Sequence, residues 1–164
     1  GFFKGMSANT FEPDSKLTRA MVIVILYRMD GSPDVNGACT FTDVLANSWY
    51  DDAVIWGSQN KIVNGLTADT FGPDAPVTRE QLVTFLYRYA NYKGYDTSSK
   101  ESIAYFPDSA NVSPYALDAM RWAVSVGLIT GTKENGKVYL YPYGNATRAQ
   151  AAAIMVRFYD ATHS

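Results

Sequence analysis

A threefold repeat is the feature that most constrains the fold of this chain of 164 residues. Its clearest mark is a Thr-Arg pair that recurs at Thr18-Arg19, Thr78-Arg79 and Thr147-Arg148. The first two pairs are 60 residues apart and the last two are 69 residues apart. Each pair opens an apolar stretch with a second arginine nine residues after the first, at Arg28, Arg88 and Arg157. A single repeat of this kind cannot bury its apolar face alone, so we expect the three copies to pack together.

A second block precedes the Thr-Arg block in copies two and three. It runs from Phe41-Thr42-Asp43 to Gly65 in copy two, and from Phe106-Pro107-Asp108 to Gly131 in copy three. Copy one keeps only the tail of this block, Phe2-Phe3-Lys4-Gly5. We therefore expect repeats at 1–30, 41–92 and 104–160 in one compact unit, with the first helix missing from the first repeat.

Both blocks have the sequence pattern of helices. Aromatic and alanine residues recur at helical spacing before each glycine loop, for example Ala53 and Trp56 in copy two. Thr78 is followed three residues later by Gln81, which is a capping box, and Thr147 with Gln150 repeats it. Copy one has Met21 at this position, so we expect its threonine cap without the reciprocal bond. The pattern predicts an all-α fold of helix–loop–helix units.

The composition excludes several classes of function. The chain has one cysteine, Cys39, and one histidine, His163, which rules out an internal disulfide framework and any multi-cysteine or multi-histidine metal centre. A net charge of −2 argues against nucleic-acid binding. The longest apolar run, 20–27, is far shorter than the roughly 20 residues of a membrane span. Because nucleotide-binding and hydrolase motifs are absent from the sequence, we expect no enzyme activity and no cofactor.

These repeats resemble the S-layer homology domain, a module that anchors proteins to bacterial cell walls. The resemblance rests on Phe-x-Asp, on the glycine loop and on three versions of Thr-Arg-Ala-Glu, which here read Thr-Arg-Ala-Met, Thr-Arg-Glu-Gln and Thr-Arg-Ala-Gln. It implies a pseudo-threefold spindle around a helical bundle. It also implies that grooves between the repeats bind a cell wall polysaccharide, an anionic polymer that typically carries a pyruvylated sugar. The implied location is exported, at the cell surface.

The resemblance also implies a set of ligand contacts. They are the arginines Arg19, Arg79 and Arg148, the tryptophans Trp56 and Trp122, and the loop glycines Gly5, Gly65 and Gly131. A guanidinium offers a fork of donors that matches a carboxylate, and each arginine follows a helix N-cap, where free N–H groups favour an anion. The tryptophans have a competing role in the core. Asp43 and Asp108 are further candidates, with turn capping as the alternative.

Two points stay open at this stage. The rival function is a protein–protein or self-assembly module, because the missing first helix leaves the apolar stretch 22–26 without a cover. An upstream segment or another chain would then complete repeat one, and adding that helix should raise the melting temperature. The second arginines, Arg28, Arg88 and Arg157, lie half a turn away from the first on the same helix. We expect them to serve as favourable charges near helix C-termini.

Overall fold

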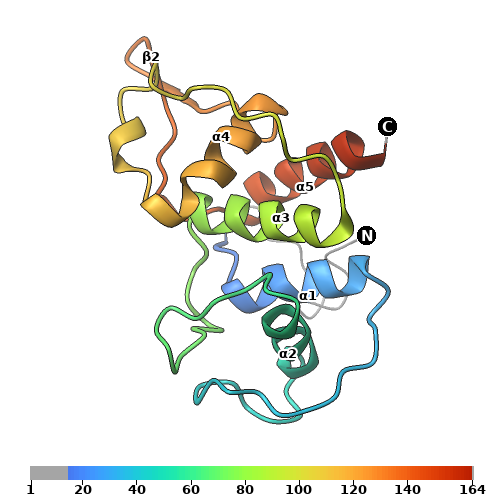
Figure 1. Ribbon diagram of the computed structural model, residues 1–164. Helices are drawn as coiled ribbons and strands as arrows, with labels where there is room; N and C mark the ends of the chain where they lie inside the picture. The colour runs from blue at the N-terminus through green and yellow to red at the C-terminus, as the bar shows by residue number, and fades with distance from the viewer. Residues whose placement is uncertain (1–14, 164) are drawn as a thin grey trace.

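The computed structural model describes residues 15–163, and within that range it is mostly helical (Figure 1). Its α-helices are α1 (Arg19–Met29), α2 (Asp51–Gln59), α3 (Arg79–Lys93), α4 (Leu117–Ser125) and α5 (Arg148–His163). Two short 3-10 turns, η1 (Ser109–Asn111) and η2 (Pro114–Ala116), precede α4. The helical fold predicted from the two blocks is confirmed, with one exception.

The exception is a β-hairpin in the loop between α4 and α5, so the strictly all-α prediction was wrong here. Strand β1 (Thr132–Glu134) pairs antiparallel with β2 (Lys137–Tyr139). The two residues between the strands, Asn135 and Gly136, both have positive φ, +50° and +77°. An Asn-Gly pair with this backbone makes the two-residue turn that best matches the twist of paired strands.

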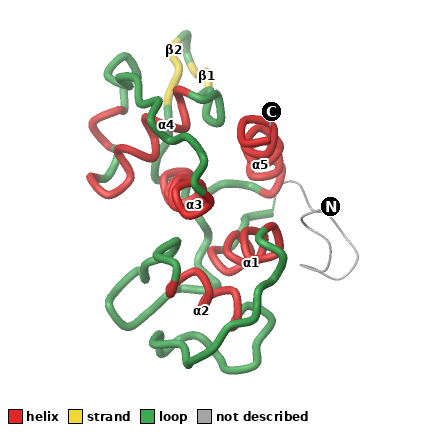
Figure 2. Tube along the Cα trace, turned by 45° about the vertical axis from the view of Figure 1, so that its right-hand side comes forward, coloured by secondary structure: helices red, strands yellow, loops and turns green. Residues whose placement is uncertain are grey.

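The three helices that begin at Thr-Arg lie together at the centre of the molecule. Figure 2 shows α1, α3 and α5 side by side, with α2 outside α1 and α4 outside α3. A ring of backbone hydrogen bonds joins the segments before these helices: Leu17 N–H donates to Ala146 O (3.2 Å), Ala146 N–H to Val77 O (2.9 Å) and Val77 N–H to Leu17 O (2.8 Å). The starts of α1, α3 and α5 therefore meet around one point.

Each of these helices is closed at its start by its threonine. The amides of Gln81 and Gln150 donate to Thr78 Oγ1 and Thr147 Oγ1, and the glutamine side chains accept from the threonine amides in return. The expectation that Met21 loses the reciprocal bond was wrong, because Thr18 N–H donates to Met21 Sδ at 3.5 Å. A thioether sulfur is a weak acceptor, but it is placed where the glutamine oxygen lies in the other repeats.

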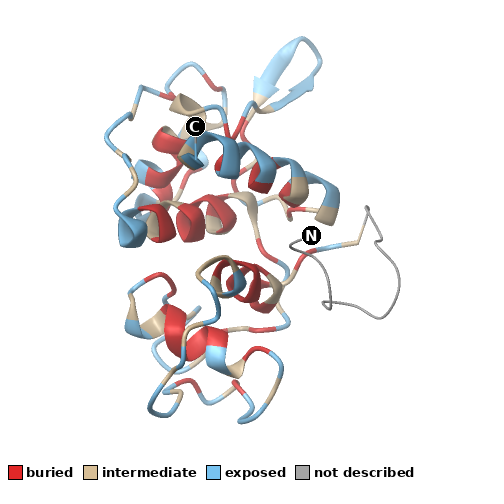
Figure 3. Ribbon diagram, turned by 90° about the vertical axis from the view of Figure 1, so that its right-hand side faces the viewer, coloured by how far each residue is buried: buried red, intermediate tan, exposed pale blue. Residues whose placement is uncertain are grey.

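The helix that we expected to lack a cover is in fact the most deeply buried. Residues 22–26 of α1 are at most 2% exposed, because α2 packs on one side and α3 on another. The exposed helix is α5, whose outer face is pale blue in Figure 3. The expectation was wrong because the first helix of a repeat covers the second helix of the preceding repeat. Among residues 15–163, no helix has the length and hydropathy to cross a membrane.

Candidate ligand-binding site

The cap arginines of copies one and two each face the glycine loop of the following repeat. The Arg19 side chain reaches Asn64 O and Phe71 O of the loop that contains Gly65. Arg79 lines a pocket together with the loop Leu128–Thr132, which contains Gly131. For Arg148, the backbone N–H donates to Ser15 O at 3.0 Å. Gly5, the loop glycine of copy one, lies outside the described residues.

Arg19 is enclosed by protein. Its side chain is 3% exposed, with Nε donating to Phe71 O (2.9 Å) and Nη2 to Asn64 O (3.0 Å). Its guanidinium carbon lies 4.9 Å from the ring centre of Phe71 and 5.0 Å from that of Phe85. Burial lowers the pKa of Arg19 to about 10, so the group still carries its charge at neutral pH. This arginine joins two repeats through contacts that are already filled.

Arg79 has a different environment, a pocket of about 220 Å³ that we call the arginine pocket. It is lined by Arg79 from α3, by Gln150 and Arg157 from α5, and by the loop Leu128–Thr132. Arg79 Nη2 donates to Gln150 Oε1 at 3.0 Å, and Arg157 Nη1 donates to Leu128 O at 3.3 Å. Burial lowers the pKa of Arg79, and a guanidinium stays protonated at neutral pH even so.

The arginine pocket therefore has the chemistry of an anion site. Arg79 and Arg157 bring two permanent cations to one hollow, and none of the described residues that line it is an aspartate or glutamate. Each guanidinium has five N–H donors in a planar fork, of which the bonds given above use few. The pocket is smaller than the roughly 300–1,000 Å³ of pockets for drug-sized ligands, so its size suits a compact anion.

Arg157 is the functional candidate that sequence reasoning missed. It was expected to act as a charge near a helix C-terminus, but α5 continues to His163 and leaves Arg157 in the helix interior. As expected from the nine-residue spacing, Arg157 lies half a turn around α5 from Arg148. Because α5 packs against α3, however, Arg157 lines the same pocket as Arg79, the cap arginine of another repeat. The only sequence signal for this pairing was the constant nine-residue spacing.

The aspartates hold the loops of their own repeats in place. Asp43 accepts hydrogen bonds from the amides of Phe71 and Gly72, both at 2.8 Å. Asp108 accepts from the amides of Leu140 (2.9 Å) and Tyr141 (2.8 Å). Both oxygens of each carboxylate are thus bonded to backbone, which matches the turn-capping alternative. Since Leu140 also lines the arginine pocket, Asp108 positions one of its walls.

The tryptophans and loop glycines also serve the framework. Trp56 and Trp122 are each 2% exposed, and their rings contact Tyr27 and Tyr87 with the same centroid distance, 5.6 Å. Their faces are covered by protein, which matches the core alternative. A side chain at Gly65 would overlap the carbonyl oxygens of Thr67 and Thr70, and one at Gly131 would overlap Val138. The glycines let the loops turn tightly enough to form the walls of the grooves.

Comparison with known proteins identifies the family of this chain. The model of the S-layer homology domain matches residues 40–83 and 105–152, more than half of the chain. The chain belongs to the S-layer homology domain family. It is 29% identical over 160 residues to the surface-layer 125 kDa protein of Lysinibacillus sphaericus, covering 96% of this chain and 13% of that protein. It is 30% identical over 151 residues to an endoglucanase of Bacillus sp. (strain KSM-635), covering 92% and 16%.

One further relative and one solved structure are also similar to this chain. A cellulosome-anchoring protein of Acetivibrio thermocellus is 28% identical over 97 residues, covering 57% of this chain and 22% of that protein. The undecaheme cytochrome from the S-layer of Carboxydothermus ferrireducens has the same fold with a TM-score of 0.54 at 16% identity, over 99% of this chain and 20% of that one.

S-layer homology domains are non-catalytic modules that anchor proteins to the cell surface. The chain spans between 13% and 22% of the surface-layer protein, the endoglucanase and the anchoring protein. The similarity to the endoglucanase is therefore limited to 16% of that protein.

Proposed function

We propose that this S-layer homology unit attaches the protein that carries it to a bacterial cell wall. It does so without catalysis, by binding an anionic secondary wall polymer, with a pyruvylated sugar as the residue recognised. The observation that supports this most strongly is the convergence of Arg79 and Arg157 on one pocket without an acidic neighbour among the described residues. A sugar that carries a carboxylate supplies the charge that this pocket lacks.

The proposed contact has a simple physical basis. The carboxylate accepts hydrogen bonds from the guanidinium groups, each such charge-assisted bond contributing about 1.5–3 kcal/mol. The loop Leu128–Thr132 also lines the pocket, and its backbone offers further polar groups. The ring of hydrogen bonds around Leu17, Val77 and Ala146 supports a pseudo-threefold spindle, in which a corresponding groove next to Arg148 would act together with this one on a repetitive polymer.

Salt should weaken the proposed interaction. Titration calorimetry with polymer released from cell walls by acid is expected to show the dissociation constant rising at least about fivefold between 0.05 M and 0.5 M NaCl, because screening shortens the reach of the arginine charges. An affinity that stays constant or rises with salt would contradict a charge-based site and favour apolar contact with a protein partner.

Gly144 borders Arg79, and a substitution there tests the role of Arg79 without changing the charge of the chain. A methyl group at Gly144 would overlap Arg79 Nη1, so Gly144→Ala should displace the guanidinium and weaken polymer binding at least about fivefold. Calorimetry checks this. The matched control is Ala75→Gly, the corresponding position next to Arg19, which should bind normally because Arg19 does not line the arginine pocket. Full affinity of Gly144→Ala would contradict the role given to Arg79.

A second candidate function rests on the outer face of α5. Tyr27 of α1 packs on Trp56 and Tyr87 of α3 packs on Trp122, each pair with an interplanar angle of 55°. The corresponding residue of α5 is Val156, which is 56% exposed. We propose that this face takes a helix like α2 or α4, with its tryptophan on Val156. Another segment or another chain would supply that helix.

The repeat gives a sharp test of this helix site. Gly1 corresponds to Gly127, so a second copy of residues 109–126 fused directly before Gly1 is in register with the repeat. The fusion is expected to melt at least about 4 °C higher than the chain itself, because it buries the exposed apolar face. The same fusion with Val156→Asp should lose the gain. An unchanged melting temperature in thermal circular dichroism would show that the face takes no such helix.

A further inference from the structure

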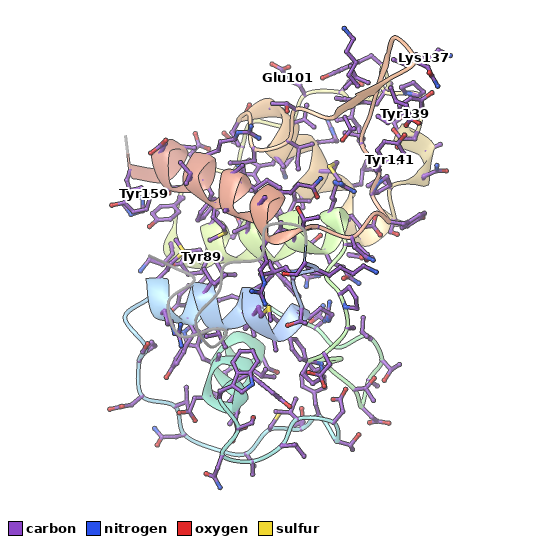
Figure 4. The ribbon with its side chains drawn as sticks, turned by 180° about the vertical axis from the view of Figure 1, so that it is seen from behind. Tyr89, Glu101, Lys137, Tyr139, Tyr141 and Tyr159 are labelled. Carbon is purple, nitrogen blue, oxygen red and sulfur yellow. The ribbon has the colours of Figure 1, made fainter. Side chains whose placement is uncertain are left out.

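A second hollow lies next to the arginine pocket, and we call it the hairpin pocket. Its volume is about 670 Å³, and its floor and walls come from the segment Tyr105–Pro107, from Val124 and Gly127 at the end of the first helix block, and from Lys137 and Val138 of β2. Figure 4 shows Lys137 and Tyr139 on the projecting hairpin and Tyr141 just after it, all well away from Tyr89.

The two pockets share one strip of backbone. Ile129 and Thr130 line the arginine pocket and the hairpin pocket alike. A chain of sugars that is held by its charged residue at Arg79 therefore has to cross only this strip to place its next residue in the hairpin pocket. A small isolated ligand would fill one pocket and leave the other empty.

The lining of the hairpin pocket suits a sugar ring. Tyr105 is 69% exposed, and its ring lies 4.4 Å from that of Phe106 at an interplanar angle of 32°. Phe106 is itself only 5% exposed, so one face of the Tyr105 ring packs against a buried side chain. A flat aromatic face with negative charge density attracts the C–H groups on the apolar side of a pyranose. Tyr105 therefore offers the open platform that the buried tryptophans do not.

The positive charge of Lys137 also favours a saccharide, in this case an anionic one. Lys137 is exposed, lines the pocket and makes no ion pair with any of residues 15–163. Its cross-strand neighbour Glu134 accepts a hydrogen bond from the Tyr141 hydroxyl, and no described residue that lines the pocket is acidic. The pocket thus combines an aromatic platform with one cation. That combination complements an acidic or otherwise anionic saccharide better than a neutral apolar ligand.

The corresponding pocket of repeat two differs from the hairpin pocket in volume, in lining residues and in the length of its loop. It has a volume of about 310 Å³ and is lined by Thr40 where repeat three has Tyr105, and by Ser58 where it has Val124. The loop from Gly131 to Leu140 is three residues longer than that from Gly65 to Phe71, and this longer loop forms the hairpin. The added length brings Lys137 and Val138 to the pocket.

We infer that the hairpin pocket is a second saccharide subsite, which holds the residue next to the one bound by the arginine pocket. Tyr105 stacks on the sugar ring and Lys137 binds an anionic group of the same polymer. This inference rests on the proposed function and deepens it. The unit accordingly recognises at least two consecutive residues of the wall polymer at the groove between repeats two and three.

The test compares ligands of different length on the whole chain. The probes are fragments of acid-released wall polymer, cut either to one charged sugar residue, the single unit, or to two or more consecutive residues, and titrated by calorimetry. Tyr105→Ala and Lys137→Ala are each expected to weaken binding of the longer fragments about fivefold to tenfold and to leave the single unit unchanged. The matched controls are Tyr143→Ala and Lys133→Ala, which are exposed but do not line the hairpin pocket.

Arg79→Ala separates this inference from the proposed function. If Arg79→Ala weakens ligands of every length while Tyr105→Ala and Lys137→Ala bind like the unmodified chain, the subsite is disproved and the arginine pocket stands. If Tyr105→Ala weakens single units and longer fragments equally, the pockets are not neighbouring subsites and the inference also fails. Normal binding by Arg79→Ala would overturn the proposed function itself. Thermal melts of each variant establish that the fold is retained.

Discussion

Arg79→Ala is expected to bind wall polymer at least about 30-fold more weakly than the unmodified chain and to melt at nearly the same temperature. The substitution removes one of the two cations of the arginine pocket, with up to two charge-assisted hydrogen bonds of about 1.5–3 kcal/mol each. Every 1.4 kcal/mol corresponds to a factor of ten in affinity. Titration calorimetry with acid-released polymer measures the loss, and thermal circular dichroism follows the fold.

Two variants serve as controls for this result. Arg79→Lys keeps the charge but loses the planar fork of donors. Its affinity for the polymer should therefore fall between those of the unmodified chain and Arg79→Ala. Arg28→Ala removes an arginine in the last turn of α1, outside the arginine pocket, and should bind normally. If Arg79→Ala bound within a factor of two of the unmodified chain, the arginine pocket would not be the polymer site.

Arg19→Ala, unlike Arg79→Ala, is expected to act mainly on the stability of the fold. It leaves the carbonyl oxygen of Phe71 without its donor inside the protein, at about 1–3 kcal/mol for a buried polar group, and also removes the part-buried hydrogen bond to Asn64 O. It also removes the cation between the rings of Phe71 and Phe85. Relief from burying the charge offsets part of this, so the free energy of unfolding should fall by about 2–4 kcal/mol.

Urea unfolding followed by circular dichroism measures this difference, with Arg79→Ala as the matched variant at the same position of the next repeat. Arg19→Ala should unfold at a distinctly lower urea concentration, and Arg79→Ala should change little. A loss below about 0.5 kcal/mol for Arg19→Ala would place it among ordinary surface substitutions and contradict the structural role of its contacts.

The difference between these two arginines could not be predicted from the sequence. Both follow a capping threonine, and both face the glycine loop of the next repeat. Whether the guanidinium is enclosed depends on that loop: after Gly65 it brings Phe71 onto Arg19, whereas after Gly131 the chain departs into the hairpin. The outcome is decided by loop length and tertiary packing, which a motif of two residues does not encode.

Features that depend on a few neighbouring residues could be predicted from the sequence. The three helix starts followed directly from Thr18, Thr78 and Thr147, because a threonine cap depends only on the next three residues. The hairpin also had a local signal, since Asn135-Gly136 between short segments is typical of a two-residue turn. That signal was overlooked because the helical repeat was extended across the loop.

The uncovered helix illustrates the limit of reasoning within one repeat. Sequence analysis assigned the missing first helix as the cover of α1, its own partner in copy one. In the structure α2 covers α1 and α4 covers α3, so the packing links each repeat to the one before it. The exposed Val156 on α5 follows from this arrangement and not from any feature of copy one.

Co-sedimentation with cell-wall sacculi tests the central claim most directly. The chain is mixed with native sacculi and with sacculi from which acid has removed the non-peptidoglycan polymer, and the pelleted fraction is measured at low salt. We predict that the chain pellets with native sacculi, stays in solution with stripped sacculi, and stays in solution with both when it carries Arg79→Ala. Equal pelleting with stripped sacculi would contradict the claim, because the ligand would then be the peptidoglycan itself.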